Sequence, residues 1–276
     1  MKQNFELPLL ETAVPGLDTV LGGGLPELSF NIIGGAPGSG KTTFAQQIMF
    51  ALANPDRKAL FFTAMGEPPI KMLRYQQQFQ FFDFDKVDSA IKFVSLAPEV
   101  EGGNYDAVLA QICEQVRLHA PALVFIDSFR SFVEGAKGEN REVHALQSFV
   151  QQLVTQMTGW HATTFLIGEY LVNEADRNPI FTVADGIVWL SQNVHRNAMV
   201  RKLQVLKMRG LKHRPGLHTF RINQQGVEIF PRMIPAAEPS GKRQEGAPKG
   251  RLSMGVPTLD KMLGGGIPAG YSMLLV

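Results

Sequence analysis

The chain contains a single cysteine, Cys113, among its 276 residues. One thiol excludes an intrachain disulfide and a metal site built from several cysteines, and it suits a reducing, cytoplasmic compartment. Charge of one sign is scarce too, because 27 lysines and arginines face 25 aspartates and glutamates, a formal charge of +2. This small excess does not indicate a polyanionic partner. No run of about 18 apolar residues and no signal-peptide core is present, so we expect neither membrane spanning nor export.

Hydrophobic residues are abundant, at 45% of the chain, and they come with 27 glycines and 17 prolines. This composition is typical of a folded globular protein and excludes disorder of the whole chain. The length allows one large domain or two smaller ones.

A segment near the start of the chain returns near its end. Residues 14–26 read VPGLDTVLGGGLP and residues 256–268 read VPTLDKMLGGGIP, with Asp18 matching Asp260. An apolar stretch follows each copy, but only the first continues into a glycine-rich loop. We therefore predict one domain over residues 1–230, a flexible Pro-, Gly- and Lys/Arg-containing linker over 231–250, and the beginning of a second domain over 251–276.

Within the first domain, short apolar runs alternate with segments of helical period. The runs predict buried strands at Ser29–Gly34, Lys58–Thr63, Ile91–Leu96, Leu123–Asp127 and Thr163–Gly168. The segments between them predict helices at Thr42–Leu52, Ile70–Phe79, Ala107–Leu118 and Glu142–Met157. Such βα units indicate an α/β fold with a mostly parallel twisted sheet flanked by helices. Shorter strands at Gly186–Ser191, Arg201–Met208, His218–Ile222 and Val227–Phe230 predict an antiparallel extension.

The strongest motif is a phosphate loop, GAPGSGKT over residues 35–42, which matches G-x-x-x-x-G-K-[ST]. It follows an apolar strand and opens a helix, so backbone N–H groups and the helix N-terminus converge on an anion. Lys41 adds a charge at the β- and γ-phosphates, and Thr42 offers a hydroxyl to Mg²⁺. The residues expected to contact ATP are Gly35, Pro37, Gly38, Ser39, Gly40, Lys41, Thr42 and Thr43.

Two kinds of carboxylate complete such a site. Asp127 ends an apolar strand, where the carboxyl edge of a parallel sheet binds ligands, and we expect it to hold Mg²⁺ with Thr42. Glu67 follows another strand and is the candidate for positioning the attacking water. An alternative reading makes Glu67 a first-turn acid of the next helix. Glu169, after the strand Thr163–Gly168, is a second candidate, as a sensor of the γ-phosphate.

A basic cluster, KMRGLKHR, covers residues 207–214. It is compatible with a nucleic-acid patch, with two cationic fingers that reach a phosphate across a subunit boundary, or with a solvated strand face. Lys207 and Arg209 are two residues apart, so on a strand both point to one side, while Met208 faces the other.

Taken together, these motifs resemble those of the RecA-like P-loop NTPases, and among them the KaiC family of clock proteins and their bacterial relatives. The resemblance rests on PGLD with GGG at residues 15–24, the phosphate loop, IDS at 126–128, KMRG at 207–210 and GVEIFP at 226–231. It implies a homo-hexameric ring with ATP and Mg²⁺ at subunit interfaces, slow hydrolysis, and a clock-like or signalling role with a regulatory protein partner. It also implies that Lys207, Arg209 and His213 lie near a neighbour's nucleotide. The paired catalytic glutamates of the clock proteins are here Met65-Gly66, with Glu67 one position later. The kinase activity of the full-length family is not assignable to this chain.

Three functions follow as hypotheses. The first is a slowly hydrolysing ring ATPase that uses Lys41, Glu67, Lys207 and Arg209 in catalysis. The second is a RecA-type DNA-binding protein, against which the low net charge argues although Phe129-Arg130-Ser131-Phe132 places an arginine between aromatic residues. The third is a scaffold whose nucleotide is structural.

Overall fold

The computed structural model describes residues 7–64, 69–98, 105–128, 141–169, 180–195, 197–233, 250–270 and 273. The chain divides into two compact units, Met1–Arg232 (unit 1) and Met233–Val276 (unit 2). The linker predicted at 231–250 lies almost wholly outside the described residues, and the predicted domain limits stay a prediction.

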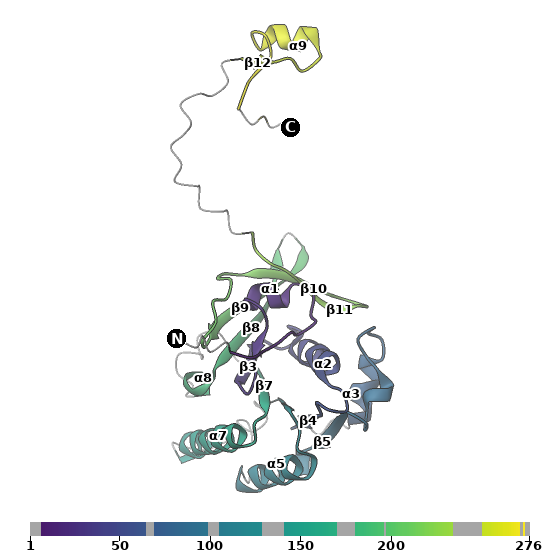
Figure 1. Cartoon of the computed structure of the whole chain (residues 1–276), viewed down its shortest axis with the longest axis vertical. Coiled ribbons are helices and arrows are strands. Elements are labelled where there is room, and N and C mark those ends of the chain that lie inside the picture. Colours follow the sequence, from purple (N-terminus) through teal and green to yellow (C-terminus); the bar gives the residue numbers. More distant parts are fainter. Residues whose placement is uncertain are drawn as a thin grey trace, which may run out of the picture. The chain divides into compact units, whose positions relative to one another are not determined.

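A nine-stranded sheet forms the centre of unit 1 (Figure 1), in the order β11-β10-β9-β8-β3-β7-β6-β4-β5. The strands that run parallel are β8 (Gly186–His195), β3 (Phe30–Gly35), β7 (Thr163–Glu169), β6 (Leu123–Asp127), β4 (Ala59–Thr63) and β5 (Ile91–Ser95). The antiparallel strands are β9 (Ala198–Met208), β10 (His218–Asn223) and β11 (Gly226–Phe230). The expected α/β fold, with its mostly parallel sheet and antiparallel extension, is confirmed.

Helices cover both faces of this sheet and create two hydrophobic cores (Figure 1). One core includes residues of α1 (Leu17–Leu21) and α2 (Lys41–Leu52); the other includes residues of α5 (Tyr105–His119), α7 (Arg141–Gly159) and α8 (Ile180–Val183). Neighbouring residues of one strand serve opposite cores, as Ile33 and Ile32 of β3 do. Burial on both faces explains why the strands read as continuous apolar runs.

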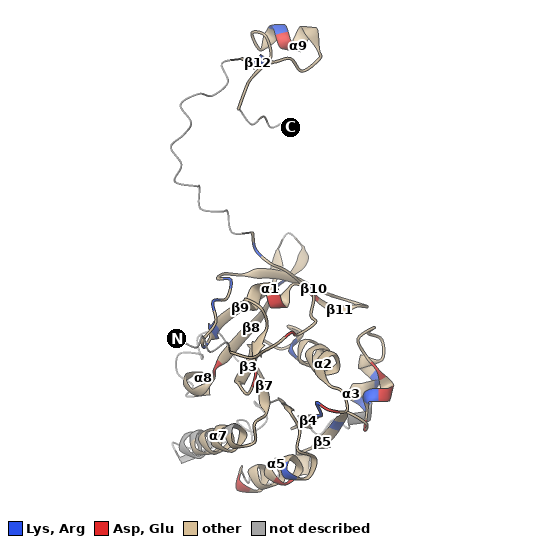
Figure 2. Ribbon diagram, viewed as in Figure 1, with Lys and Arg blue, Asp and Glu red and all other residues tan. Residues whose placement is uncertain are grey.

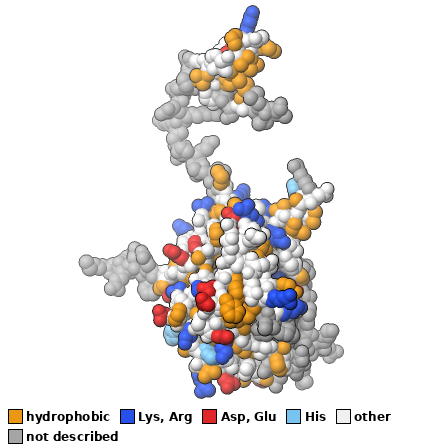
Figure 3. Space-filling model, turned by 90° about the vertical axis from the view of Figure 1, so that its right-hand side faces the viewer, with side chains coloured by type: hydrophobic (Ala, Val, Ile, Leu, Met, Phe, Trp, Pro, Cys, Tyr) orange, Lys and Arg blue, Asp and Glu red, His pale blue; other side chains and the backbone are white. Residues whose placement is uncertain are grey.

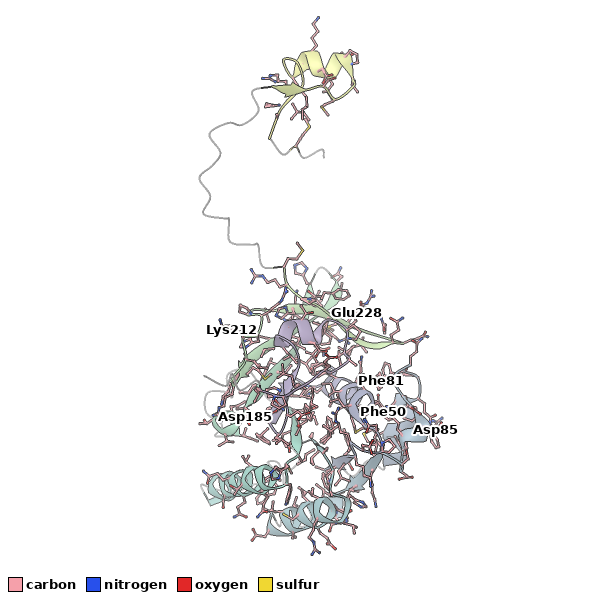
Figure 4. All side chains as sticks on the ribbon, in the orientation of Figure 1. Phe50, Phe81, Asp85, Asp185, Lys212 and Glu228 are labelled. Carbon is pink, nitrogen blue, oxygen red and sulfur yellow. The ribbon has the colours of Figure 1, made fainter. Side chains whose placement is uncertain are left out.

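The segment after β4 differs from the sequence prediction. Its helix, α3 (Pro69–Gln76), ends three residues before Phe79, and a short 3₁₀ turn, η1 (Phe84–Lys86), precedes β5. Phe79 stacks on Phe81 with ring centroids 5.2 Å apart, and Phe81 packs on Phe50 of α2 at 6.1 Å (Figure 4). These aromatic contacts favour an irregular chain path over a longer helix.

The entry segment of unit 1 consists of β1 (Leu9–Leu10), α1 and β2 (Leu25–Pro26). Asp18 of α1 organises it, since its Oδ1 accepts hydrogen bonds from the backbone N–H of Thr12 (3.0 Å) and from the Thr12 hydroxyl (2.7 Å). Gly16 has a φ of 79°, and a Cβ there would lie 2.0 Å from the carbonyl oxygen of Ile229. Only glycine fits between α1 and β11 at this point.

Unit 2 repeats this local structure with β12 (Arg251–Leu252), α9 (Pro257–Met262) and β13 (Ile267–Pro268). Asp260 takes the role of Asp18, accepting hydrogen bonds from the Met254 N–H (2.8 Å) and the Ser253 hydroxyl (2.6 Å). The apolar face differs in exposure: Val14 and Val20 are buried in unit 1, whereas their counterparts Val256 and Met262 are 50% and 80% exposed. The described part of unit 2 therefore leaves uncovered the face that the sheet covers in unit 1.

Candidate nucleotide-binding site

The phosphate loop joins the carboxyl end of β3 to the start of α2 and is fitted closely against its neighbours. Gly35 and Gly40 have φ values of 147° and 100°, in the region that favours glycine. A Cβ on Gly35 would lie 2.0 Å from the carbonyl oxygen of Leu190 in β8, and a Cβ on Gly40 would lie 2.6 Å from Ile222 of β10. The glycines therefore let the loop lie against the sheet, and α2 begins directly behind it, an arrangement that favours anion binding.

Lys41, the lysine of this loop, is turned inward. Its ammonium group donates to the carbonyl oxygen of Ala36 at 2.9 Å, and the side chain is buried. Burial lowers the pKa of Lys41, and the nearby carboxylates of Glu169 and Asp127 act in the opposite direction. The hydroxyl of Ser39 is also buried and has no hydrogen-bond partner within the described part of the chain. A cation and an unpartnered hydroxyl in one glycine-rich loop fit a phosphate group.

Thr42 and Asp127 meet beneath the loop, as a magnesium site requires. The Thr42 hydroxyl donates to Asp127 Oδ2 at 2.6 Å. Burial raises the pKa of Asp127 to about 6; the Thr42 hydrogen bond and Lys41 limit the rise, and Glu169 adds to it. A divalent cation would favour the ionised carboxylate. The described residues contain no group of three or more His, Cys, Asp and Glu able to hold a metal, so Mg²⁺ here would take further oxygens from phosphate and water.

Glu169 lies closer to the phosphate loop than its position in the sequence suggests. It ends β7, the strand between β3 and β6, and its Cα is the register partner of Gly35. Its carboxylate acts on the pKa of both Lys41 and Asp127. The other candidate, Glu67, lies outside the described residues.

Gln192 contacts the phosphate loop, although no sequence motif identifies it. It lies on β8 beyond the predicted end of that strand, and its side-chain amide donates to the carbonyl oxygen of Pro37 at 3.3 Å. The only signal in the sequence was its position just after the apolar run Gly186–Ser191, on what proves to be the other neighbour of β3. This hydrogen bond ties Pro37 of the phosphate loop to β8. Thr43, the last residue expected to contact ATP, follows Thr42 in the first turn of α2.

Lys207 and Arg209 lie together, but away from this loop. The Lys207 ammonium donates to the carbonyl oxygen of Thr182 at 2.9 Å, and the Arg209 guanidinium pairs with Asp185 at 2.9 Å. Their mutual repulsion contributes to a lowered pKa of Lys207, second to burial. β9 ends at Met208, so Arg209 follows the strand instead of lying on it, and Met208 itself is buried. Both cations therefore reach the segment 181–185, which includes the end of α8 and the residues that follow it (Asp185 is labelled in Figure 4).

This segment is fixed to the amino end of β3. The Phe30 N–H donates to Asp185 Oδ2 at 3.0 Å, and the Asp185 N–H donates to the Phe30 carbonyl at 2.8 Å. The phosphate loop begins at the other end of β3, five residues on, which is about 16 Å along a strand. An extended lysine or arginine side chain does not span that distance. In one copy of the chain, the two cations and the phosphate loop are separate sites.

His213 follows the basic pair. Its Nδ1 is buried and has no hydrogen-bond partner among the described residues. The residues on either side of it hold the backbone to the entry segment: a Cβ on Gly22 would lie 2.2 Å from the Lys212 carbonyl oxygen, and the Arg214 N–H donates to the Val20 carbonyl at 2.8 Å. The role of His213 near a nucleotide stays a prediction.

Comparison with known proteins agrees with this geometry. The family model described as "ATPase: KaiC" matches residues 10–234. The circadian clock oscillator protein KaiC of Picosynechococcus is 30% identical over 93% of this chain, and the chain spans half of that protein's length. A UPF0273 protein of Thermotoga maritima is 26% identical, with 80% of this chain and 96% of that protein aligned.

A solved structure gives the same answer for the fold. The KaiC-like protein of Pyrococcus horikoshii aligns with a TM-score of 0.69 at 24% identity, over 82% of this chain and all of the other. At that identity the likeness concerns the fold, while the family model covers the sheet, the phosphate loop and the basic pair. The chain belongs to the KaiC family of ATPases, and its unit 1 is a RecA-like P-loop NTPase domain.

Proposed function

We propose that this chain is a Mg²⁺-dependent ATPase that works as a homo-hexameric ring, with each ATP bound between two copies. The observation that carries the proposal is the separation of the phosphate loop from Lys207 and Arg209 by the length of β3. Arg209 keeps 66% of its side chain exposed although it is paired with Asp185, so it is available to another copy. In a head-to-tail ring, the carboxyl edge of one sheet meets the amino edge of the next, and the two half-sites combine.

In this site Lys41 and the loop amides bind the β- and γ-phosphates, while Thr42 and Asp127 hold Mg²⁺. The bound metal would supply charge neutralisation at the phosphate oxygens. Glu67 orients the attacking water, and Glu169, level with Gly35, senses the γ-phosphate. Lys207 and Arg209 of the neighbour, with His213 near them, stabilise charge that develops on the transferred phosphoryl group. Turnover then depends on assembly.

The setting of this activity is part of the proposal. Curated relatives are named circadian clock oscillator proteins, and slow, assembly-dependent hydrolysis suits a clock-like or signalling role with a regulatory protein partner. Lysines, arginines, aspartates and glutamates are interspersed over unit 1 (Figure 2), which does not favour a nucleic-acid partner. No described helix combines the length and the apolar character needed to cross a membrane. Unit 2 is proposed to be the beginning of a second domain of the same kind.

A mixing experiment tests the shared site. A Lys41→Ala variant has a defective phosphate loop but intact fingers, and a Lys207→Ala/Arg209→Ala variant has the converse. We expect each alone to release phosphate at least about tenfold more slowly than the wild type, with ATP affinity of the finger variant mostly retained. In a one-to-one mixture, about a quarter of random interfaces pair a sound loop with sound fingers, so phosphate release should recover to about a quarter of the wild-type rate.

The control is Arg117→Ala, which removes an exposed cation on α5 and should leave the rate unchanged. A mixture as inactive as its components, or a monomer that hydrolyses ATP at the full rate, would refute the shared site. Phosphate release by Glu67→Gln and Glu169→Gln separates the two carboxylates: a greater loss in kcat from Glu67→Gln supports its role with water. Absence of phosphate release by the wild type would leave only a nucleotide-stabilised scaffold.

A further inference from the structure

The hairpin formed by β8 and β9 extends beyond the sheet at the edge that carries the phosphate loop. β8 pairs with β3 only from Gly186 to Leu190, where Leu190 is level with Gly35. From Ser191 to His195 it pairs only with β9. Five further residues correspond to about 16 Å of strand. Gln192 rests on the loop through Pro37, so the rest of the hairpin stands out past the site that would bind the phosphates.

Two large apolar side chains near the far end of this hairpin are exposed. Val194 and Met199 are register partners on the two strands, and residues directly opposite each other share one face of the ribbon. They are 71% and 51% exposed. Figure 3 shows hydrophobic side chains on a projection from unit 1. This pair, on an element that projects from the sheet, is placed where another surface can cover it.

The opposite edge of the sheet offers a matching feature beside the basic pair. Ile187 pairs with Lys207 and Val188 with Val205, so Leu206 is the extra residue of a bulge in β9. Leu206 is 40% exposed, whereas Val205 before it is buried. A bulge redirects side chains at the edge of a sheet. Here it turns Leu206 outward next to the cation that would enter a neighbour's site.

We propose that the hairpin tip, Val194 and Met199, packs on the amino edge of a second copy of this chain, against Leu206. This inference rests on the ring ATPase proposed above and specifies one of its contacts. The tip and Leu206 lie at opposite edges of the same sheet, so a single head-to-tail contact uses both and repeats around a ring. The contact joins the edge that bears Lys207 and Arg209 to the hairpin beside the phosphate loop of the next copy.

The test uses full-length chain in which Val194→Thr and Met199→Gln remove apolar surface but keep side-chain size and strand preference. Sedimentation velocity over a range of protein concentrations with Mg²⁺-ATP measures assembly, and phosphate release is followed on the same samples. We expect the protein concentration for half-assembly to rise about tenfold or more. Activity per chain should recover at high concentration, because no residue of the nucleotide site is altered. Leu206→Gln alone should give a defect of the same kind.

Leu118→Gln is the matched control, since Leu118 at the end of α5 is 68% exposed and should not affect assembly. Unchanged far-UV circular dichroism and thermal unfolding confirm that the hairpin variant folds. Wild-type assembly by the folded hairpin variant overturns this inference, and so does wild-type assembly by Leu206→Gln. In that case restored activity in the mixing experiment would keep the ring ATPase intact. A wild-type chain that remains a fully active monomer would refute both.

Discussion

Replacing Asp127 with asparagine removes a carboxylate that burial holds at a pKa of about 6, against 3.8 for an ordinary aspartate. The folded protein therefore binds this proton more tightly than the unfolded chain does. The stability contributed by the protonated carboxyl is present below pH 4 and is lost as the pH rises to about 6. At about 1.4 kcal/mol per pH unit, ionisation of Asp127 costs the nucleotide-free protein about 3 kcal/mol above pH 7.

Asparagine retains an oxygen that can accept the hydrogen bond from Thr42, and it carries no charge to desolvate. We expect Asp127→Asn to have a free energy of unfolding about 3 kcal/mol higher than the wild type at pH 8, and about half that advantage at pH 5. Mg²⁺-ATP should reverse the order, because it stabilises the wild type through the Asp127 carboxylate. ATP hydrolysis by the variant should fall at least about tenfold.

Urea titrations between pH 5 and pH 8, with and without Mg²⁺-ATP, measure these differences. Asp56→Asn is the control, because it makes the same chemical change at an exposed residue in the turn before β4. An Asp127→Asn variant that is no more stable than the wild type at pH 8, or whose advantage does not change with pH, would refute the placement of this carboxylate beneath the loop.

Two further predictions concern the loop and the helix behind it. Gly35→Ala should lower the free energy of unfolding by more than about 3 kcal/mol, as measured by urea titration, because its Cβ would lie 2.0 Å from the Leu190 carbonyl oxygen; a smaller loss would show that the loop moves freely. Gln47→Ala should lower the free energy of unfolding by about 2–4 kcal/mol. The Gln47 side chain accepts a hydrogen bond from the N–H of buried Val227 (2.6 Å) and donates one to its carbonyl oxygen (3.1 Å). Its neighbour Gln46 is fully buried, and neither of its side-chain polar atoms has a partner among the residues that the structure describes. Gln46→Met should therefore be neutral or stabilising, and an equal loss in both variants would contradict the argument.

The sequence predicts well what local signals encode. Strands buried on both faces are continuous apolar runs, so β3, β4, β6 and β7 lie within one residue of their expected ends. The edge strand β5 does too, although part of it is exposed. The phosphate loop has a motif that carries its own geometry. Asp127 could be assigned because a carboxylate after a buried strand falls at the ligand-binding edge of a parallel sheet.

Features that depend on contacts distant in the sequence could not be read in this way. β8 was expected to end at Ser191 and β9 to begin at Arg201, because the residues between them lack an apolar pattern; they form strands by pairing with each other. Gln192 carries no motif, and its importance comes from the register of β8 on β3. The distance between the fingers and the phosphate loop likewise appears only once the order of the strands is known.

One of the four positions at which residues 14–26 and 256–268 differ has a consequence for how the chain folds during synthesis. Thr258 stands where the first copy has Gly16, and a β-branched side chain there would meet the Ile229 carbonyl in a backbone conformation that threonine avoids. Residues 256–268 therefore fit poorly in the position that residues 14–26 occupy beside β11, although the apolar residues of the two copies match. Similar segments in one polypeptide can exchange places and cause misassembly. The steric clash at Thr258 disfavours that exchange.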